Sequence, residues 1–461
     1  MAQSEISGPV LRRSLRLITF GVCLCMVYVP VTASPIFTEF LREMGATAFH
    51  FGLLAGIPMS LFVMQFVGAL INNRIRNRKV PFTVLLIASR LVYLIIAFSP
   101  LLFPGLHDTQ RIALILALVS GGALLLNLAA PLWFAWMADL IPHSLLGRYW
   151  GNRQRWMFVT WTISYVGMAV FTYATPWPAS TTYPILACIS VAAGITDILL
   201  FIGVPDPGNT LVTGVSVLQV LKEPFQHAEY RTFVRWSVVK SFAMMLSGAF
   251  LQLYALDVLK MPLWQTTIAW CILGIGVALS SRMWGRIADA HGQRPVLLLV
   301  MYGKPIVSLV FLLVTPATAF PVLSTWFFFD GVLNGGLLVA TDGYMLRMAP
   351  RRNRSMFIAT ITGLAGISGG IGAIAGGHVI QMLSGWHWNG FGREWNHYQV
   401  VFAVSFLLRL LCIPLTARIR EVKSSSTLRV LLDVAGQPQR SFLRFPIGLY
   451  RRMQQNPDNN S

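Results

Sequence analysis

The sequence predicts an all-α protein that crosses a lipid bilayer many times. Hydrophobic residues make up 55% of its 461 residues, and charged residues make up only 11%. A soluble protein of this length has about 25% charged residues. The chain also contains twelve apolar runs, and each is long enough to cross a bilayer as a helix of about 20 residues. Together these features predict a polytopic membrane protein with twelve transmembrane helices.

Charges, glycines and prolines bound the predicted spans. The spans cover approximately 15–36, 50–71, 81–103, 111–141, 156–175, 183–204, 232–257, 263–284, 295–315, 320–346, 355–383 and 398–417. Outside them we expect a cytoplasmic lead at 1–14, a cytoplasmic linker at 205–231 and a basic cytoplasmic tail at 418–461. All five cysteines fall inside apolar runs, with no spacing that indicates a metal site or a disulfide. We therefore expect no metal and no cofactor.

Lysine and arginine are distributed unequally between the two sides of the predicted membrane. With the first residue placed inside, the inside segments carry 28 of the 36 basic residues and the outside loops carry four. Because positive charge is retained on the cytoplasmic side, both termini are predicted to be cytoplasmic. The net charge of +19 is then a topology signal, and we expect no nucleic-acid partner. The expected location is the plasma membrane, in particular a bacterial inner membrane.

Features of the first half of the chain recur in the second half. Pro81 precedes Arg90 by nine residues, and Pro295 precedes Lys304 by nine residues. Other residues of the first half also have counterparts in the second half, about 207–216 residues further along the chain. Such a repeat is typical of transporters built from two related halves. We therefore expect two pseudo-symmetric six-helix bundles, at 15–204 and 232–417.

One loop carries a specific motif. Gly285, Asp289, Gly292 and Arg294 lie between the eighth and ninth predicted spans, in the spacing G-x-x-x-D-x-x-G-x-R. Gly285 at a helix end allows close approach of a neighbouring helix, and Gly292 permits a tight reversal. This pattern closely resembles the signature loop of the major facilitator superfamily.

The resemblance, in motif, span count and repeat, covers approximately 15–417. It implies two bundles that rock about a central site, with helices 1, 4, 7 and 10 lining the cavity. It also implies a gating role for the loop, in which Asp289 meets the start of the eleventh span near Arg351, Arg352 and Arg354.

The corresponding loop of the first half departs from the family pattern. Residues 73–79 keep the basic side chains, but an asparagine stands in place of the acid. Asp139, at the end of the fourth span, is expected to supply the missing carboxylate to Arg74, Arg76 or Arg148. These residues complete the predicted gating set.

Seven ionisable residues lie inside predicted spans, where charge is costly and usually functional. Four of them fall on helices 3, 6, 9 and 12, which the resemblance places outside the cavity: Arg90, Asp197, Lys304 and Arg409. We expect these four to have structural roles, with Arg90 and Asp197 as an ion pair.

A second polar set falls on the helices that the resemblance places around the cavity. The predicted substrate-binding residues are Tyr28, Asn127, Lys240, Tyr254, Asp330 and Asn334. Interhelical hydrogen bonding is the alternative role for this set. Asp330 is the first candidate for a proton carrier, because burial away from a partner favours the protonated carboxyl group. Asp342 and His378 are the other candidates, and Lys240 is expected to pair with Asp330 or Asp342 if it does not bind substrate.

These features predict a secondary active transporter of a small organic solute that works by alternating access. Import, export, uniport and proton-coupled transport are all consistent with the sequence. A membrane protein that only binds or senses a solute is one alternative, and a polytopic membrane enzyme is another. Because the histidines are scattered and no nucleophile motif is present, we expect no enzymatic activity. The predicted partners are the solute and the lipid bilayer, and we expect a monomer.

Overall fold

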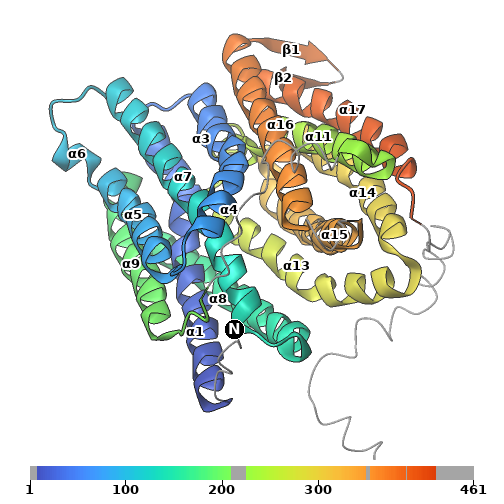
Figure 1. Cartoon of the computed structure of the whole chain (residues 1–461). Helices are drawn as coiled ribbons and strands as arrows, with labels where there is room; N and C mark the ends of the chain where they lie inside the picture. Colours follow the sequence, from blue (N-terminus) through green and yellow to red (C-terminus); the bar gives the residue numbers. More distant parts are fainter. Residues whose placement is uncertain (1–7, 209–224, 349–353, 391, 422–461) are drawn as a thin grey trace, which may run out of the picture.

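The computed structural model describes residues 8–208, 225–348, 354–390 and 392–421. These residues contain twelve helical segments that are long and apolar enough to cross a membrane. The prediction of an all-α membrane protein with twelve spans is therefore confirmed. Figure 1 shows the helices of the first half of the chain on the left and those of the second half on the right.

The first six spans contain several short interruptions. In chain order the elements are α1 (Gly8–Thr32), α2 (Pro35–Glu43), α3 (Ala48–Ser60), η1 (Leu61–Met64), α4 (Gln65–Arg74), α5 (Lys79–Ala97), α6 (Ser99–Leu102), α7 (Asp108–Leu140), α8 (His143–Ala174), α9 (Ala179–Leu200) and η2 (Phe201–Gly203). The first span is divided between α1 and α2, because Pro35 lacks the N–H that would continue the helix.

The second six spans repeat this arrangement. Their elements are α11 (Ala228–Gly248), α12 (Leu251–Asp257), α13 (Leu263–His291), α14 (Gln293–Leu313), η3 (Pro316–Thr318), α15 (Ala319–Met348), α16 (Arg354–Met382), β1 (His387–Gly390), β2 (Arg393–Asn396) and α17 (His397–Ala417). The seventh span is divided between α11 and α12 in the same way that the first is divided between α1 and α2.

The two ends of the molecule carry different features. At one end β1 and β2 form an antiparallel hairpin in which Trp388 pairs with Trp395; we call this end the hairpin face (Figure 1). The other end carries Gly8 and Ala417, and we call it the terminal face. These strands were not predicted, because segments of four residues are too short to show an alternating pattern.

The most extensive contacts between the halves are those of α3 with α16 and of α8 with α13. The contact between α3 and α16 depends on small residues. A Cβ added at Gly56 would lie 2.6 Å from the carbonyl oxygen of Gly370, and one added at Gly377 would lie 2.7 Å from that of Ala48. The glycines of the eleventh span thus allow α16 to pack closely against α3.

Candidate functional site

A cavity of about 610 Å³ lies between the two halves. Residues of α1, α2, α3, η1, α5 and α7 line it from the first half, and residues of α11, α12 and α13 line it from the second. We call it the central cavity. Its polar lining consists of Tyr28, Thr32, Thr38, Ser89, Arg90, Tyr93, Asn127 and Gln252. Its volume falls within the range of about 300–1,000 Å³ that is usual for small-molecule sites.

Two predicted substrate residues, Tyr28 and Asn127, lie at the wall of the central cavity. Both are buried. The Asn127 side chain accepts a hydrogen bond from Gln65 Nε2 at 3.0 Å and donates one to the carbonyl oxygen of Ala123 at 2.9 Å. These bonds fix the orientation of the amide at the cavity wall.

Arg90 also lines the central cavity, so the expectation that it lies outside the cavity is wrong. It is in α5, where it faces α1 and α9. Its guanidinium carbon lies 3.8 Å from the centre of the Tyr28 ring, and its Nη2 lies 4.0 Å from Asp197 Oδ2. The expected pair of Arg90 and Asp197 is thus present, although its separation exceeds hydrogen-bonding distance.

A smaller pocket of about 180 Å³ lies on the other side of Arg90, inside the first half. Asp197, Arg153 and Trp133 line it together with Arg90. The Arg153 guanidinium lies 5.0 Å from the centre of the Trp133 ring. Arg90 therefore stands between this pocket and the central cavity.

In the second half, Asp330 is paired with Lys304. The Nζ of Lys304 lies 2.6 Å from Asp330 Oδ1 and 2.9 Å from Asn334 Oδ1, and Asn334 Nδ2 donates to Asp330 Oδ2 at 3.0 Å. Of the two partners expected for Lys240, Asp330 pairs instead with Lys304, and Lys240 Nζ lies 4.6 Å from the centre of the Trp236 ring. Asp342 is near enough to interact electrostatically with Lys240. Lys304 thus forms a buried ion pair within the second half.

Arg409 holds the same region together from α17. It donates to Ser405 and Ser247 side chains and to the Lys304 carbonyl oxygen at 3.1 Å each, and to the Met244 carbonyl oxygen at 3.3 Å. These bonds join α11, α14 and α17 inside the second half. The structural role expected of Arg409 agrees with these contacts.

Several predicted site residues lie away from the central cavity. Tyr254 is buried among Phe311, Tyr398 and Phe402. Asp342 and His378 are exposed, on α15 and α16 respectively. The described lining of the cavity does not include the predicted substrate residues Lys240, Tyr254, Asp330 and Asn334.

The predicted charge contacts at the terminal face are rearranged in the first half. Asp139 pairs with Arg78, at 2.7 Å, and not with Arg74, Arg76 or Arg148 as expected. Arg78 is fully buried, and Asp206 accepts hydrogen bonds from both its backbone N–H, at 2.8 Å, and its guanidinium, at 3.1 Å. Arg74 is exposed at the end of α4.

The signature loop of the second half also has unexpected contacts. Asp289 Oδ1 lies 3.8 Å from Arg347 Nη2 at the end of α15. Its expected partners, Arg351 and Arg352, lie outside the described residues, as does the side chain of Arg354. The side chain of Arg148 is likewise outside the described part. A Cβ added at Gly285 would meet nothing within 4 Å, so the expectation of a close helix approach there is wrong.

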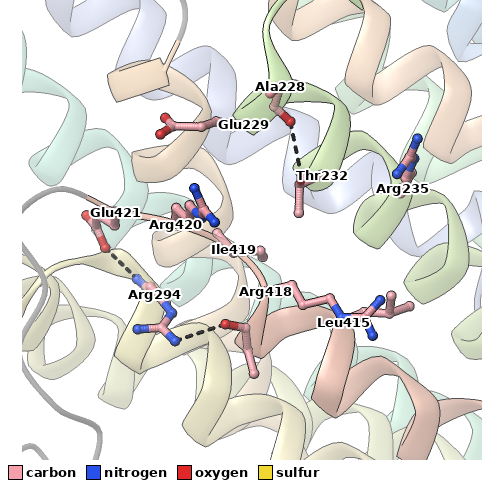
Figure 2. Close-up of a pocket in the computed structure, with 11 residues that line it drawn as sticks. Ala228, Glu229, Thr232, Arg235, Arg294, Leu415, Arg418, Ile419, Arg420 and Glu421 are labelled. Carbon is pink, nitrogen blue, oxygen red and sulfur yellow. Dashed lines mark hydrogen bonds between the residues drawn. The ribbon is translucent and has the colours of Figure 1, made fainter.

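Gly292 and Arg294 take the positions that the motif predicts. Gly292 has a φ of 96°, which allows the tight reversal between α13 and α14. The Glu421 carboxylate accepts hydrogen bonds from the backbone N–H groups of Gln293, at 3.1 Å, and Arg294, at 2.8 Å. Figure 2 shows this contact within a pocket of about 760 Å³ at the terminal face, distinct from the central cavity.

Comparisons with known proteins agree with this architecture. Residues 271–430 match the model of the major facilitator superfamily. This match extends from the eighth span to beyond the twelfth, so the second half of the chain is similar to this superfamily. A comparison with curated protein sequences found no match.

Solved structures of several transporters have a similar fold. A mutant of the nucleoside transporter NupG has a TM-score of 0.65 at 12% identity, covering 89% of this chain and 100% of its own. A bacterial homologue of the human lysosomal transporter Spinster, inward-facing and occupied, has a TM-score of 0.61 at 14% identity. The match covers 95% of this chain and 99% of the homologue. The inward-open xylose transporter XylE from E. coli has a TM-score of 0.61 at 16% identity. The match covers 92% of this chain and 98% of XylE. At these identities the likeness concerns the fold.

The sequence analysis missed two polar contributors to the central cavity region. Gln252, from α12, lines the cavity and accepts a hydrogen bond from Thr38 at 2.8 Å. Gln65 holds Asn127, as described above. Each is a polar residue within an apolar span, and such residues are usually buried against protein or cavity. That signal was available in the sequence but was not applied to these two glutamines.

Proposed function

We propose that this major facilitator protein is a secondary active transporter that moves a small organic solute by alternating access. The observation that carries the proposal is the central cavity, which lies where the two six-span halves meet. Relocation of two rigid halves about such a cavity would expose a bound solute to each side in turn. We place the transporter in a bacterial inner membrane, with the terminal face in the cytoplasm, because the basic residues are concentrated on that face.

Contacts between the halves at the hairpin face support an inward-facing state for this structure. Arg42 Nε lies 2.6 Å from Asp257 Oδ1, and Thr38 donates to Gln252 at 2.8 Å. Both contacts join α2 to α12, and so they hold the two halves together on this side of the cavity. The proposal requires them to break when the outward-facing state forms.

Asp330 is the proposed proton carrier of this transporter. It is buried, and a protonated carboxyl group would no longer form an ion pair with Lys304. Loss of that pair would change the contact between α14 and α15, and a difference of this kind between states is what coupling requires. Asp342 and His378 are the secondary candidates.

Uptake into proteoliposomes tests the proposed function. A panel of radiolabelled organic acids, sugars and nucleosides is offered with and without a pH gradient, and we expect saturable uptake of at least one. Leu126 lines the central cavity and is 43% exposed, so Leu126→Trp should fill the cavity and reduce this uptake at least tenfold. Leu101→Trp is the matched control, because Leu101 is 76% exposed in α6. Binding of a solute without uptake would contradict transport and favour a sensing role.

A further inference from the structure

We propose that the central cavity binds a small organic carboxylate, and that Arg90 is the residue that holds its charged group. This inference rests on the proposed function, since it names the solute class of the same cavity. Arg90 is the charged side chain among the described residues that line the cavity. The cavity therefore presents one positive group and no negative group to a solute.

The hydrogen bonding of Arg90 differs from that of the other buried arginines. Arg78 and Arg409 each donate hydrogen bonds to oxygen atoms at distances between 2.7 and 3.3 Å. Arg90 instead contacts the Tyr28 side chain, Cys25 Sγ at 3.5 Å and Asp197 Oδ2 at 4.0 Å, so its nearest described carboxylate lies beyond hydrogen-bonding distance.

A buried guanidinium with incomplete hydrogen bonding is costly unless a further acceptor joins it. An anion in the adjoining cavity would supply that acceptor. A carboxylate fits best, because it can accept two parallel N–H bonds from one guanidinium.

The rest of the cavity indicates the body of the solute. Phe51, Phe62 and Trp270 supply aromatic surface, and Met245 adds apolar surface from the second half. Thr32, Thr38, Ser89, Asn127 and Gln252 add uncharged polar side chains to the lining. The carboxylate of such a solute would contact Arg90, and the apolar or aromatic remainder of the solute would contact the largely apolar wall.

Thermal unfolding of the purified full-length protein in detergent tests the inference without any need for transport. The probes are benzoate, phenylacetate and 3-phenylpropionate, each compared with its uncharged amide and with the amine of the same length. We expect at least one carboxylate to raise the melting temperature in a saturable way, since a ligand of the native state stabilises it. The matching amide and amine should produce at least tenfold weaker binding.

Two variants assign the site. Arg90→Gln should weaken carboxylate binding at least tenfold, and Arg90→Lys should retain part of it. Arg111→Gln is the matched control, because Arg111 pairs with Asp108 outside the cavity. If Arg90→Gln does not fold, Leu126→Trp should abolish the carboxylate effect by filling the space beside Arg90 while leaving every charge in place.

Specific outcomes would overturn the inference. Equal stabilisation by amides or amines would do so, as would unchanged carboxylate binding in Arg90→Gln, or no stabilisation by any of the carboxylates. Saturable uptake of a neutral solute with no carboxylate binding would reject the solute class and leave the transport proposal standing. Carboxylate binding without uptake would reject the transport proposal and leave the solute class standing.

Discussion

Asp330 and Lys304 form the closest ion pair buried between spans of the second half, at 2.6 Å. In a membrane interior such a pair is stable only while both groups are charged, because either charge alone is strongly disfavoured. Neutralising Asp330 would therefore remove the ionic partner of Lys304. A resulting movement of Lys304 would also change the hydrogen bond that its carbonyl oxygen accepts from Arg409. A single proton at this residue would alter contacts among α14, α15 and α17.

Replacement of Asp330 tests this coupling. Asp330→Asn imitates the protonated state permanently, so we expect uptake to lose its dependence on a pH gradient while solute exchange across the membrane continues. Uptake into proteoliposomes with and without an inward proton gradient measures the effect. Asp342→Asn is the comparison, since Asp342 is on the same helix but exposed. Gradient dependence that survives in Asp330→Asn would move the role to Asp342 or His378.

At the scale of elements, glycines determine how closely the two halves approach. Gly56 and Gly370 lie at the crossing of α3 and α16, and a Cβ on Gly56 would lie 2.6 Å from the Gly370 carbonyl oxygen. The backbones at this crossing are therefore in direct contact, which only the absence of side chains permits. Side chains introduced here would act as wedges between the halves.

Gly56→Val should weaken closure of this crossing. Overpacking a tight contact costs about 1–3 kcal/mol, enough to shift a two-state equilibrium by a factor of about 5–150. We expect uptake to fall by about that factor, with expression and monodispersity retained. Gly167→Val is the control, because a Cβ at Gly167 meets nothing within 4 Å. A loss of uptake of the same size in both variants would count against a specific role for the crossing.

The sequence predicted the elements better than it predicted their contacts. Hydropathy alone locates the spans, because crossing a bilayer requires a long apolar helix whatever its neighbours are. The break between α11 and α12 was not predicted, since no proline follows Gly248 to mark it. Arg90 was placed outside the cavity by its span number, whereas its actual position depends on how α5 is rotated. Partners such as Arg78 for Asp139 depend on side-chain geometry that sequence spacing does not contain.

At the scale of the whole molecule, the two halves carry equivalent contacts at the terminal face. Asp206 binds the backbone N–H of Arg78, and Glu421 binds that of Gln293. Both acceptors and both donors are separated by 215 residues. In each half a carboxylate after the last span thus caps the helix of the third span, where the helix dipole favours negative charge. Each half is thereby braced internally, as a rigid moving unit would need to be.

The ion pair of Arg42 and Asp257 acts between the halves instead, and its two side chains are about one-third exposed. An ion pair of this kind contributes only about 0–1 kcal/mol at an exposed site. That modest energy suits a contact that must form and break in each transport cycle.

Pulsed electron paramagnetic resonance tests alternating access most directly. With the native cysteines replaced, one pair of spin labels at 102 and 382 reports on the hairpin face, and a second pair at 77 and 290 reports on the terminal face. We predict two distance populations for each pair, with Arg42→Ala lengthening distances at the hairpin face and shortening those at the terminal face. A single distance at both faces, unchanged by Arg42→Ala and by every solute that is taken up, would contradict a transporter whose halves move about the central cavity.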